Sequence, residues 1–251
     1  MIIKMISKNN IGLSVFLSLF AGIFVVMPFI SSCGKSTVSP STLNVQYQVI
    51  NLSPNLGPVD LYIDFKIYNK SSFIYPSASG YFYLSSIDTP FQIRPSQTLT
   101  QTQTVISTGN IFNMDDILKP NFKYTLFLTG LTGDSSVTRV LTVDTANLPT
   151  VGSGKLRFIN LSPRSSGLDV VINGTASIPF TNVQYLKQTP FVQLPAGTYD
   201  FQIFLTGSTS IVQDHPNVVI QDGRAYTLYA YGLVGHTTDS LAFGAGVVTN
   251  R

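Results

Sequence analysis

A segment of about 100 residues occurs twice in the chain, with matching motifs in the same order. Residues 49–54 (VINLSP) match residues 158–163 (FINLSP), and residues 60–64 (DLYID) match residues 169–173 (DVVIN) at the same offset of 109. A period near 100 residues is the size of a single small domain. We therefore expect two domains of one fold, at residues 45–148 and 155–251, with a linker at residues 149–154.

The match continues downstream at different offsets. The triplet TPF occurs at residues 89–91 and 189–191, and YTL occurs at residues 124–126 and 226–228. Changes in offset mark insertions, which belong in loops. The pattern predicts nine extra residues in the first copy between Asp64 and Thr89, and two fewer before Tyr124.

Composition favours strands over helices. All 12 acidic residues are Asp, Trp is absent, and 17 Phe and 12 Tyr stand among many Thr, Val and Ile residues. A chain without Glu lacks a common helix former, whereas β-branched and aromatic residues prefer strands. Turn residues recur every 8 to 12 positions, which is typical of a β-sandwich. We expect an all-β protein of two tandem immunoglobulin-like antiparallel β-sandwich domains. In the second copy the pattern predicts strands at residues 156–160, 168–173, 191–194, 198–205, 218–220, 225–233 and 241–248.

One helical turn is expected at residues 113–118 (NMDDIL), where Asn113 can cap and Asp115 and Asp116 face the positive end of the dipole. Calcium binding by these two carboxylates is disfavoured, since it needs six or more oxygen ligands.

Three tyrosines resemble tyrosine corners, in which a ring at the start of a strand bonds back to the preceding turn. Tyr226 follows the turn dipeptide Asp222-Gly223, Tyr199 follows a Pro-Ala-Gly turn, and Tyr124 is the counterpart of Tyr226 in the first copy. We assign these residues a structural role.

The N-terminal segment indicates export. Lys4 and Lys8 precede an apolar run at residues 11–30, which ends in Ser31, Ser32 and the sole Cys, Cys33. This ending resembles the lipobox of bacterial lipoproteins, which implies a signal peptide at residues 1–32, a lipidated Cys33 carrying acyl chains such as palmitate, and a tether at residues 33–44. Two or more acyl chains hold a protein stably on a bilayer. The alternative is an uncleaved transmembrane helix, which interspersed Gly and Ser residues and Pro28 weaken.

The paired Asn-Leu-Ser-Pro segments, the following acidic residues Asp60 and Asp169, and the Tyr-Thr-Leu strands ending at Gly130 and Gly232 resemble the bacterial domain of unknown function 4397. The resemblance implies an immunoglobulin-like sandwich in an envelope protein, without catalytic residues. Together with the lipobox it places the protein in the cell envelope, at the outer membrane, with periplasmic or outward orientation open.

Little in the sequence supports catalysis. There are two His residues, no Glu and no nucleophile motif, so Asp214 with His215, and His236 with Asp239, are interpreted as solvated loop pairs. We expect no catalytic residue, no metal site and no cofactor. The formal charge of +3 falls to +1 without the leader lysines, which gives no reason to expect nucleic-acid binding.

Strand alternation predicts one candidate binding surface. In the strand at Tyr226, the face shared with the first copy (Tyr226, Leu228, Ala230) should be core, which leaves Tyr229 and Tyr231 on an outer face. Outward aromatic rings suit a protein or glycan contact. The competing interpretation is that they pack against the other copy or against the Tyr81-Phe82-Tyr83 segment of the first copy.

The sequence therefore predicts a lipid-anchored envelope protein with a non-catalytic binding or scaffolding role. One alternative is a structural spacer of an envelope assembly. The other is an unrecognised enzyme.

Overall fold

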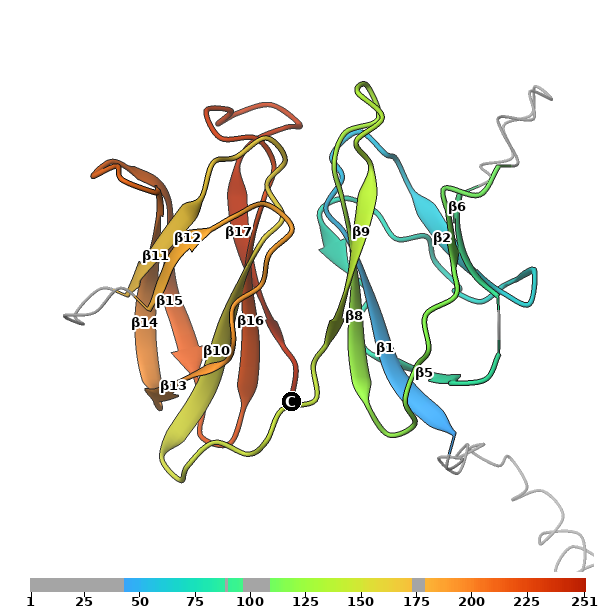
Figure 1. Ribbon diagram of the computed structural model, residues 1–251, viewed down its shortest axis with the longest axis horizontal. Coiled ribbons are helices and arrows are strands. Elements are labelled where there is room, and N and C mark those ends of the chain that lie inside the picture. Colours follow the sequence, from blue (N-terminus) through green and yellow to red (C-terminus); the bar gives the residue numbers. More distant parts are fainter. Residues whose placement is uncertain (1–42, 89, 97–108, 173–178) are drawn as a thin grey trace, which may run out of the picture. The chain divides into compact units, whose positions relative to one another are not determined.

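The computed structural model describes residues 43–88, 90–96, 109–172 and 179–251. Regular structure in these ranges consists of strands (Figure 1). Among the described residues, no helix has the length and apolarity needed to cross a membrane. Cys33, the leader and the tether lie outside these ranges.

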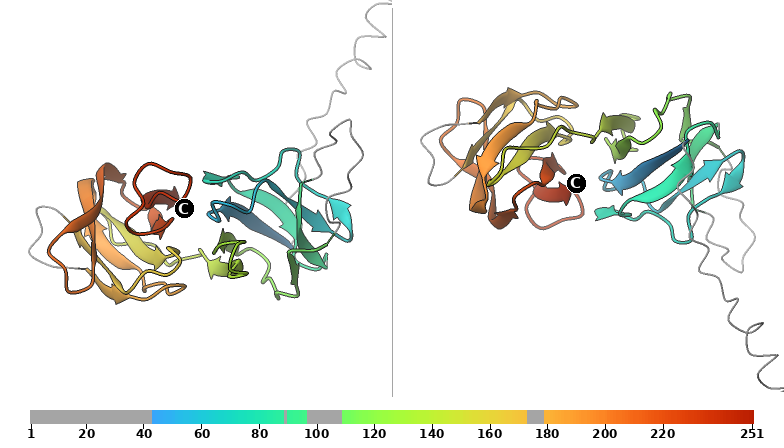
Figure 2. Two further views of the ribbon diagram at one scale, coloured as in Figure 1. Left: turned by 90° about the horizontal axis from the view of Figure 1, so that it is seen from above. Right: turned by 90° about the horizontal axis from the view of Figure 1, so that it is seen from below.

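The first module, residues 44–143, contains two sheets (Figure 2). One sheet has the order β4-β1-β8-β9, with β5 also paired to β1, and the other has the order β3-β2-β6-β7. The strands are β1 (Asn44–Asn51), β2 (Val59–Ile63), β3 (Lys66–Ile67), β4 (Ser77–Ala78), β5 (Phe82–Ser85), β6 (Phe91–Pro95), β7 (Phe112–Met114), β8 (Lys123–Thr129) and β9 (Thr138–Val143).

The second module, residues 153–249, repeats this plan with sheets β13-β10-β16-β17 and β12-β11-β14-β15. Its strands are β10 (Ser153–Asn160), β11 (Leu168–Ile172), β12 (Phe180–Val183), β13 (Val192–Pro195), β14 (Gly197–Leu205), β15 (Ile211–Ile220), β16 (Ala225–Tyr231) and β17 (Gly244–Thr249). All seven strands expected here are present in part or whole, and β12 is additional.

The all-β expectation is confirmed, but the sheets are not purely antiparallel. Strands β1 and β8 pair in parallel, and so do their counterparts β10 and β16. Parallel neighbours need a long crossover, and in each module the chain builds the opposite sheet before it returns. The first and the next-to-last strand of each module therefore lie side by side, and the last strand pairs with the next-to-last one on its other edge.

Each module has its own core between its two sheets. In the first module, inward side chains of β1, β2, β6 and β8 form one buried cluster that includes Val49, Leu61 and Leu126. In the second, the equivalent cluster includes Phe158, Val170 and Leu228. Tyr226, Leu228 and Ala230 all belong to this core, as strand alternation predicted.

The position predicted for the insertion is wrong. Phe91 pairs with Ile63, and Phe201 pairs with Ile172, so the copies still correspond at an offset of 110 at these strands. Met114, which pairs with Phe91, corresponds to His215, which pairs with Phe201, at an offset of 101. The nine extra residues therefore lie between β6 and β7. The TPF match misled because it aligned strands of different sheets.

The helical turn expected at residues 113–118 is also absent. Asn113 and Met114 end strand β7, which pairs with β6, and the residues after it are irregular. Met114 is fully buried, so strand pairing and burial override the capping pattern. Asp116 instead accepts a hydrogen bond from Arg139 at 2.6 Å.

Candidate functional site

The three expected tyrosine corners have structural geometry. The Tyr124 hydroxyl accepts a hydrogen bond from the backbone N–H of Lys119 at 2.8 Å, and the Tyr226 hydroxyl accepts one from Gln221 at 3.1 Å. The hydroxyl of Tyr199 donates to the carbonyl of Pro195 at 2.8 Å. Each ring thus fixes the turn that precedes its strand.

The repeated Asn-Leu-Ser-Pro motif has a structural role, because its Asn and Ser side chains form hydrogen bonds within the fold. The Asn51 side chain accepts from the Ser53 N–H at 3.1 Å, and the Ser53 hydroxyl donates to the Gly130 carbonyl at 2.7 Å. The same bonds recur from Asn160 and Ser162 in the second module, at 3.0 Å to the Ser162 N–H and 2.6 Å to the Gly232 carbonyl. The motif therefore joins the end of the first strand to the end of the returning strand.

Tyr229 and Tyr231 do not form an exposed binding surface. Tyr229 is 9% exposed and belongs to a buried cluster with side chains of both modules, while Tyr231 is partly buried against that cluster. The ring of Tyr229 lies 5.8 Å from that of Phe127 in the first module. Burial raises the pKa of Tyr229 to about 12, with Tyr231 as the next cause. The outer face is covered by the other copy, which corrects the expectation of an aromatic docking surface.

The contact between the modules uses equivalent residues of both. Its buried cluster contains equivalent residues of the two copies. Ile50 and Leu52 of the first module correspond to Ile159 and Leu161 of the second at the offset of 109, and Phe127 corresponds to Tyr229. Use of the same face on both partners is the pattern of a two-fold symmetric interface. The described residues of both modules accordingly belong to one compact unit.

A buried polar network crosses this contact. Arg157 is 3% exposed and forms an ion pair with Asp144, whose side chain is 0% exposed. The carboxylate also accepts hydrogen bonds from the hydroxyls of Tyr81 at 2.7 Å, Thr125 at 2.5 Å and Thr142 at 2.8 Å. Burial lowers the pKa of Arg157, and the charge of Asp144 opposes that shift. Burial, followed by the charge of Asp144, raises the pKa of Tyr81.

Of the two histidine–aspartate pairs that the sequence singled out, one forms a hydrogen bond at the surface. His236 Nδ1 lies 2.7 Å from Asp239 Oδ2, on side chains that are 40% and 51% exposed. Asp214 and His215 are neighbours on the edge strand β15, where burial lowers the pKa of His215. Within the described ranges, no three His, Cys, Asp or Glu side chains are grouped so that they could hold a metal ion.

Exposed apolar side chains are concentrated in one stretch of the first module's sequence. Of the thirteen large hydrophobic residues exposed in the described part of the chain, seven lie between residues 43 and 87: Leu43, Phe65, Ile67, Tyr68, Ile74, Tyr83 and Ile87. Large apolar patches on a soluble domain mark contact sites. This part of the molecule is therefore the first place to look for a binding site.

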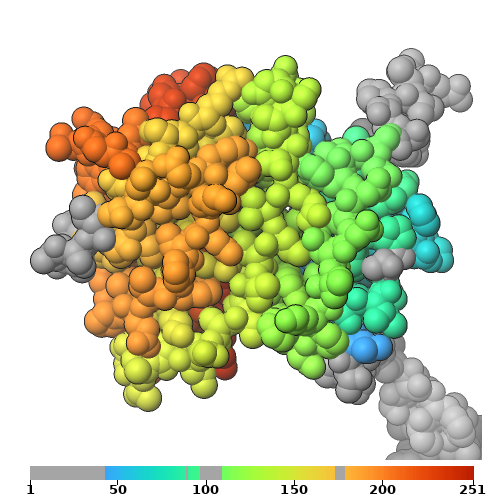
Figure 3. All heavy atoms as spheres, viewed as in Figure 1, coloured from blue at the N-terminus to red at the C-terminus, as the bar shows by residue number. Residues whose placement is uncertain are grey.

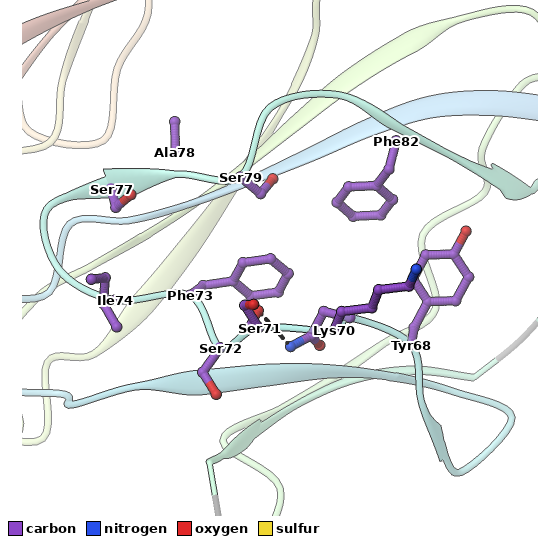
Figure 4. Close-up of a pocket in the computed structure, with 11 residues that line it drawn as sticks. Tyr68, Lys70, Ser71, Ser72, Phe73, Ile74, Ser77, Ala78, Ser79 and Phe82 are labelled. Atoms are coloured by element: carbon purple, nitrogen blue, oxygen red, sulfur yellow. Dashed lines mark hydrogen bonds between the residues drawn. The ribbon is translucent and has the colours of Figure 1, made fainter.

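A pocket of about 510 Å³ opens within the same region (Figure 4). Two segments line it, residues 68–74 between β3 and β4 and residues 77–82 from β4 to the start of β5. The rings of Phe73 and Phe82 lie between these segments in the close-up. Volumes of 300 to 1,000 Å³ are usual for small-molecule sites.

The lining combines aromatic rings with polar groups. The rings of Tyr68 and Phe82 lie 5.5 Å apart at 38°, and the Tyr68 hydroxyl donates to the Tyr83 carbonyl. Burial raises the pKa of Tyr68, and the charge of Asp88 raises it further. Asn69 is fixed by bonds to Asp60 at 2.8 Å and to the Ser71 carbonyl at 2.9 Å.

Other polar groups of the lining remain available to a ligand. Lys70, Ser71 and Ser77 are exposed, and their side chains form no hydrogen bond within the described residues. An ammonium group and two hydroxyls thus stand beside aromatic rings. The sequence signal was the run of serines and aromatics at residues 68–83, which strand alternation alone did not single out.

Comparison with protein families gives one match, described as a domain of unknown function (DUF4397), over residues 45–170 and again over residues 154–244. No curated protein matches the chain.

Proposed function

The chain belongs to the DUF4397 family, and from this premise and the geometry above we propose that it is a lipid-anchored cell-envelope protein with a non-catalytic binding role. The proposal places the binding site in the pocket of the first module. It also includes an immunoglobulin-like relationship of the sandwiches, which the tyrosine corners at Tyr124 and Tyr226 support.

The observation that carries the binding role is the pocket beside Phe82, with free polar groups around aromatic rings. An apolar ligand would leave Lys70 and the hydroxyls of Ser71 and Ser77 without partners, at a cost in affinity. A glycan offers both hydroxyls for these groups and C–H faces for the rings. We therefore propose a glycan of the cell envelope as the ligand.

Calorimetric titration of the protein with soluble oligosaccharides, including chitin and maltose oligomers and soluble peptidoglycan fragments, tests this site. Lys70→Ala with Ser77→Ala should weaken binding about tenfold or more, equal to about 1.4 kcal/mol. Both residues are exposed, so the fold should survive. Tyr83→Ala, which removes an exposed ring outside the pocket lining, is the matched control. Equal binding by the pocket variant and the control would contradict the assignment.

The anchor is tested separately. Cys33→Ala should abolish acylation and release the protein from the membrane fraction, because one thiol carries the lipid. An intact Met1 and an unmodified Cys33 on the membrane-bound wild type, seen by mass spectrometry, would contradict the anchor.

A second candidate function is that of a rigid spacer. It is favoured by the buried contact between the modules, in particular the ion pair of Arg157 and Asp144. Arg157→Gln alone, which leaves the buried Asp144 charge unpaired at the contact, should then keep ligand binding but lose envelope function, which separates the two roles.

A further inference from the structure

Three segments carry exposed apolar side chains in the part of the first module where the described chain begins. We call Leu43, Phe65, Ile67 and Ile87 the tether edge; their exposed fractions are 40%, 63%, 55% and 65%. The Ser86 N–H donates to the Leu43 carbonyl at 2.9 Å, which holds the residue before Ile87 beside the start of β1. The Asp64 N–H donates to the Pro90 carbonyl at 3.2 Å, which holds the β2–β3 turn against the same connection.

The β2–β3 turn presents an aromatic ring in an unusual backbone conformation. Phe65 has φ of 62° and Asp64 has φ of 49°, in the left-handed region that bulky residues rarely adopt. A small or polar residue would fit this turn with less strain. Strain at an exposed position suggests a role for the side chain outside the fold. The turn reaches the surface at the cyan edge in Figure 3, and the first residues of β1 are the blue atoms below it.

The covalent chain limits what can meet this edge. Nine residues lie between Cys33 and Leu43, so a fully extended chain places Leu43 at most about 35 Å from Cys33. If Cys33 carries lipid, Leu43 is always within about that distance of the bilayer, and the backbone hydrogen bonds above connect Ile87 and the β2–β3 turn to it. Apolar side chains held so close to a membrane gain free energy by entering the headgroup boundary.

The charges around the edge indicate an uncharged contact. Lys66 lies 4.0 Å from Asp64, with side chains 86% and 68% exposed, and Asp88 follows Ile87. Because cations do not outnumber anions there, attraction to acidic lipids gives no advantage. Contact through apolar side chains should instead be insensitive to salt.

We propose that the tether edge docks the first module onto the bilayer that holds Cys33, with Phe65 and Ile67 in the headgroup boundary. The proposal rests on the lipid anchor of the proposed function. Docking would fix the height and orientation of the glycan pocket relative to the membrane.

The absence of Trp from the chain allows a direct test. Phe65→Trp is introduced into the full acylated protein, which is reconstituted into phosphatidylcholine vesicles with brominated acyl chains. We expect the fluorescence of this Trp to be quenched at least twofold, equally at low and high salt. Val219→Trp, at a residue 53% exposed in the second module, is the matched control and should remain unquenched. A Trp at position 65 that is quenched no more than the control would overturn the proposal.

A second variant set separates this inference from the anchor. Phe65→Ser with Ile67→Ser removes exposed groups only, so folding and Cys33 acylation should be unchanged, while an Ile87→Trp reporter in the same chain should lose its quenching. Quenching that persists would contradict docking through these residues. A failure of the anchor is recognised independently, as an unmodified Cys33 mass and release from the vesicles. Quenching that depends on salt would overturn the proposal in favour of a charged contact. Self-association of the wild type that these substitutions abolish would overturn it in favour of a contact with a second copy of the chain.

Discussion

Neutralising one member of the Arg157–Asp144 pair should unfold the protein at markedly lower denaturant concentration. Both side chains are buried, at 3% and 0% exposed, so neither charge can turn to water when its partner is lost. Removing one partner of a buried pair costs about 3 to 5 kcal/mol. In Arg157→Gln the Asp144 carboxylate keeps three hydroxyl donors, among them Tyr81 at 2.7 Å, so we expect the free energy of unfolding to fall by about 3 kcal/mol.

In Asp144→Asn the guanidinium keeps its neutral partners but loses its counter-charge. Arg157 still donates to the Thr227 hydroxyl at 2.9 Å and to the Val143 carbonyl at 2.9 Å. These bonds do not compensate a full charge, so the loss should be nearer 5 kcal/mol. The molecule contains its own neutral version of this arrangement, because Gln48 and Asn250 occupy the equivalent positions.

The double variant Arg157→Gln with Asp144→Asn should therefore lose less than either single variant. Urea unfolding followed by circular dichroism gives the four free energies of unfolding and their coupling. The wild type should unfold in one transition, since the network joins the modules. Losses below about 1 kcal/mol in the single variants, as exposed pairs show, or losses that simply add in the double variant, would refute the reasoning.

Three further predictions concern the repeated structural features. Gly232→Ala should lower the free energy of unfolding by about 3 kcal/mol or more, because φ is +73° and a Cβ would lie 2.0 Å from the Ala242 carbonyl oxygen. The control Gly207→Ala has a φ of +82° but open space around the new Cβ, so it should lower the free energy of unfolding by only about 1 kcal/mol. Equal losses for the two variants in thermal unfolding would contradict the steric argument. Tyr226→Phe should cost about 1 to 2 kcal/mol in urea unfolding, because it leaves a backbone N–H unpaired, and no loss would remove the corner from the stability of the module. Burial raises the pKa of Tyr229 to about 12, above the value near 10 that a tyrosine has in an unfolded chain. The free energy of unfolding should therefore fall as the pH rises from about 10 to 12, and Tyr229→Phe should reduce this fall. The same pH profile in the variant and the wild type would argue against a buried phenol.

Much of the fold could be predicted because its signals are local. The alternation of Tyr226, Leu228 and Ala230 identified the core face, and the turn before Tyr226 identified the corner. The insertion could not be placed, because Phe91 and Phe191 share a local motif although Phe91 lies in β6 and Phe191 directly precedes β13, which belongs to the non-equivalent sheet of its module. Only pairing across the sheet reveals which strands correspond.

The candidate site was less predictable for a related reason. Alternation along β8 and β16 predicts that their outward faces are exposed to solvent. The same alternation of side chains would occur if another module covered those faces. The pocket beside Phe82 joins two loop segments whose approach depends on both sheets. Neither the covered faces nor the pocket produces a distinct hydrophobic periodicity in the sequence.

The amino-acid sequence alone determined that this protein is a duplicated β-rich chain, because strand preference, alternation and turn chemistry act between near neighbours. The tertiary structure decided which faces meet. It buried Tyr229 against Phe127 and turned Arg157 toward Asp144, since a side chain that points out of its own sheet is exposed or buried according to what folds over it. Burial is a property of the whole packed unit, and no short stretch of sequence contains it.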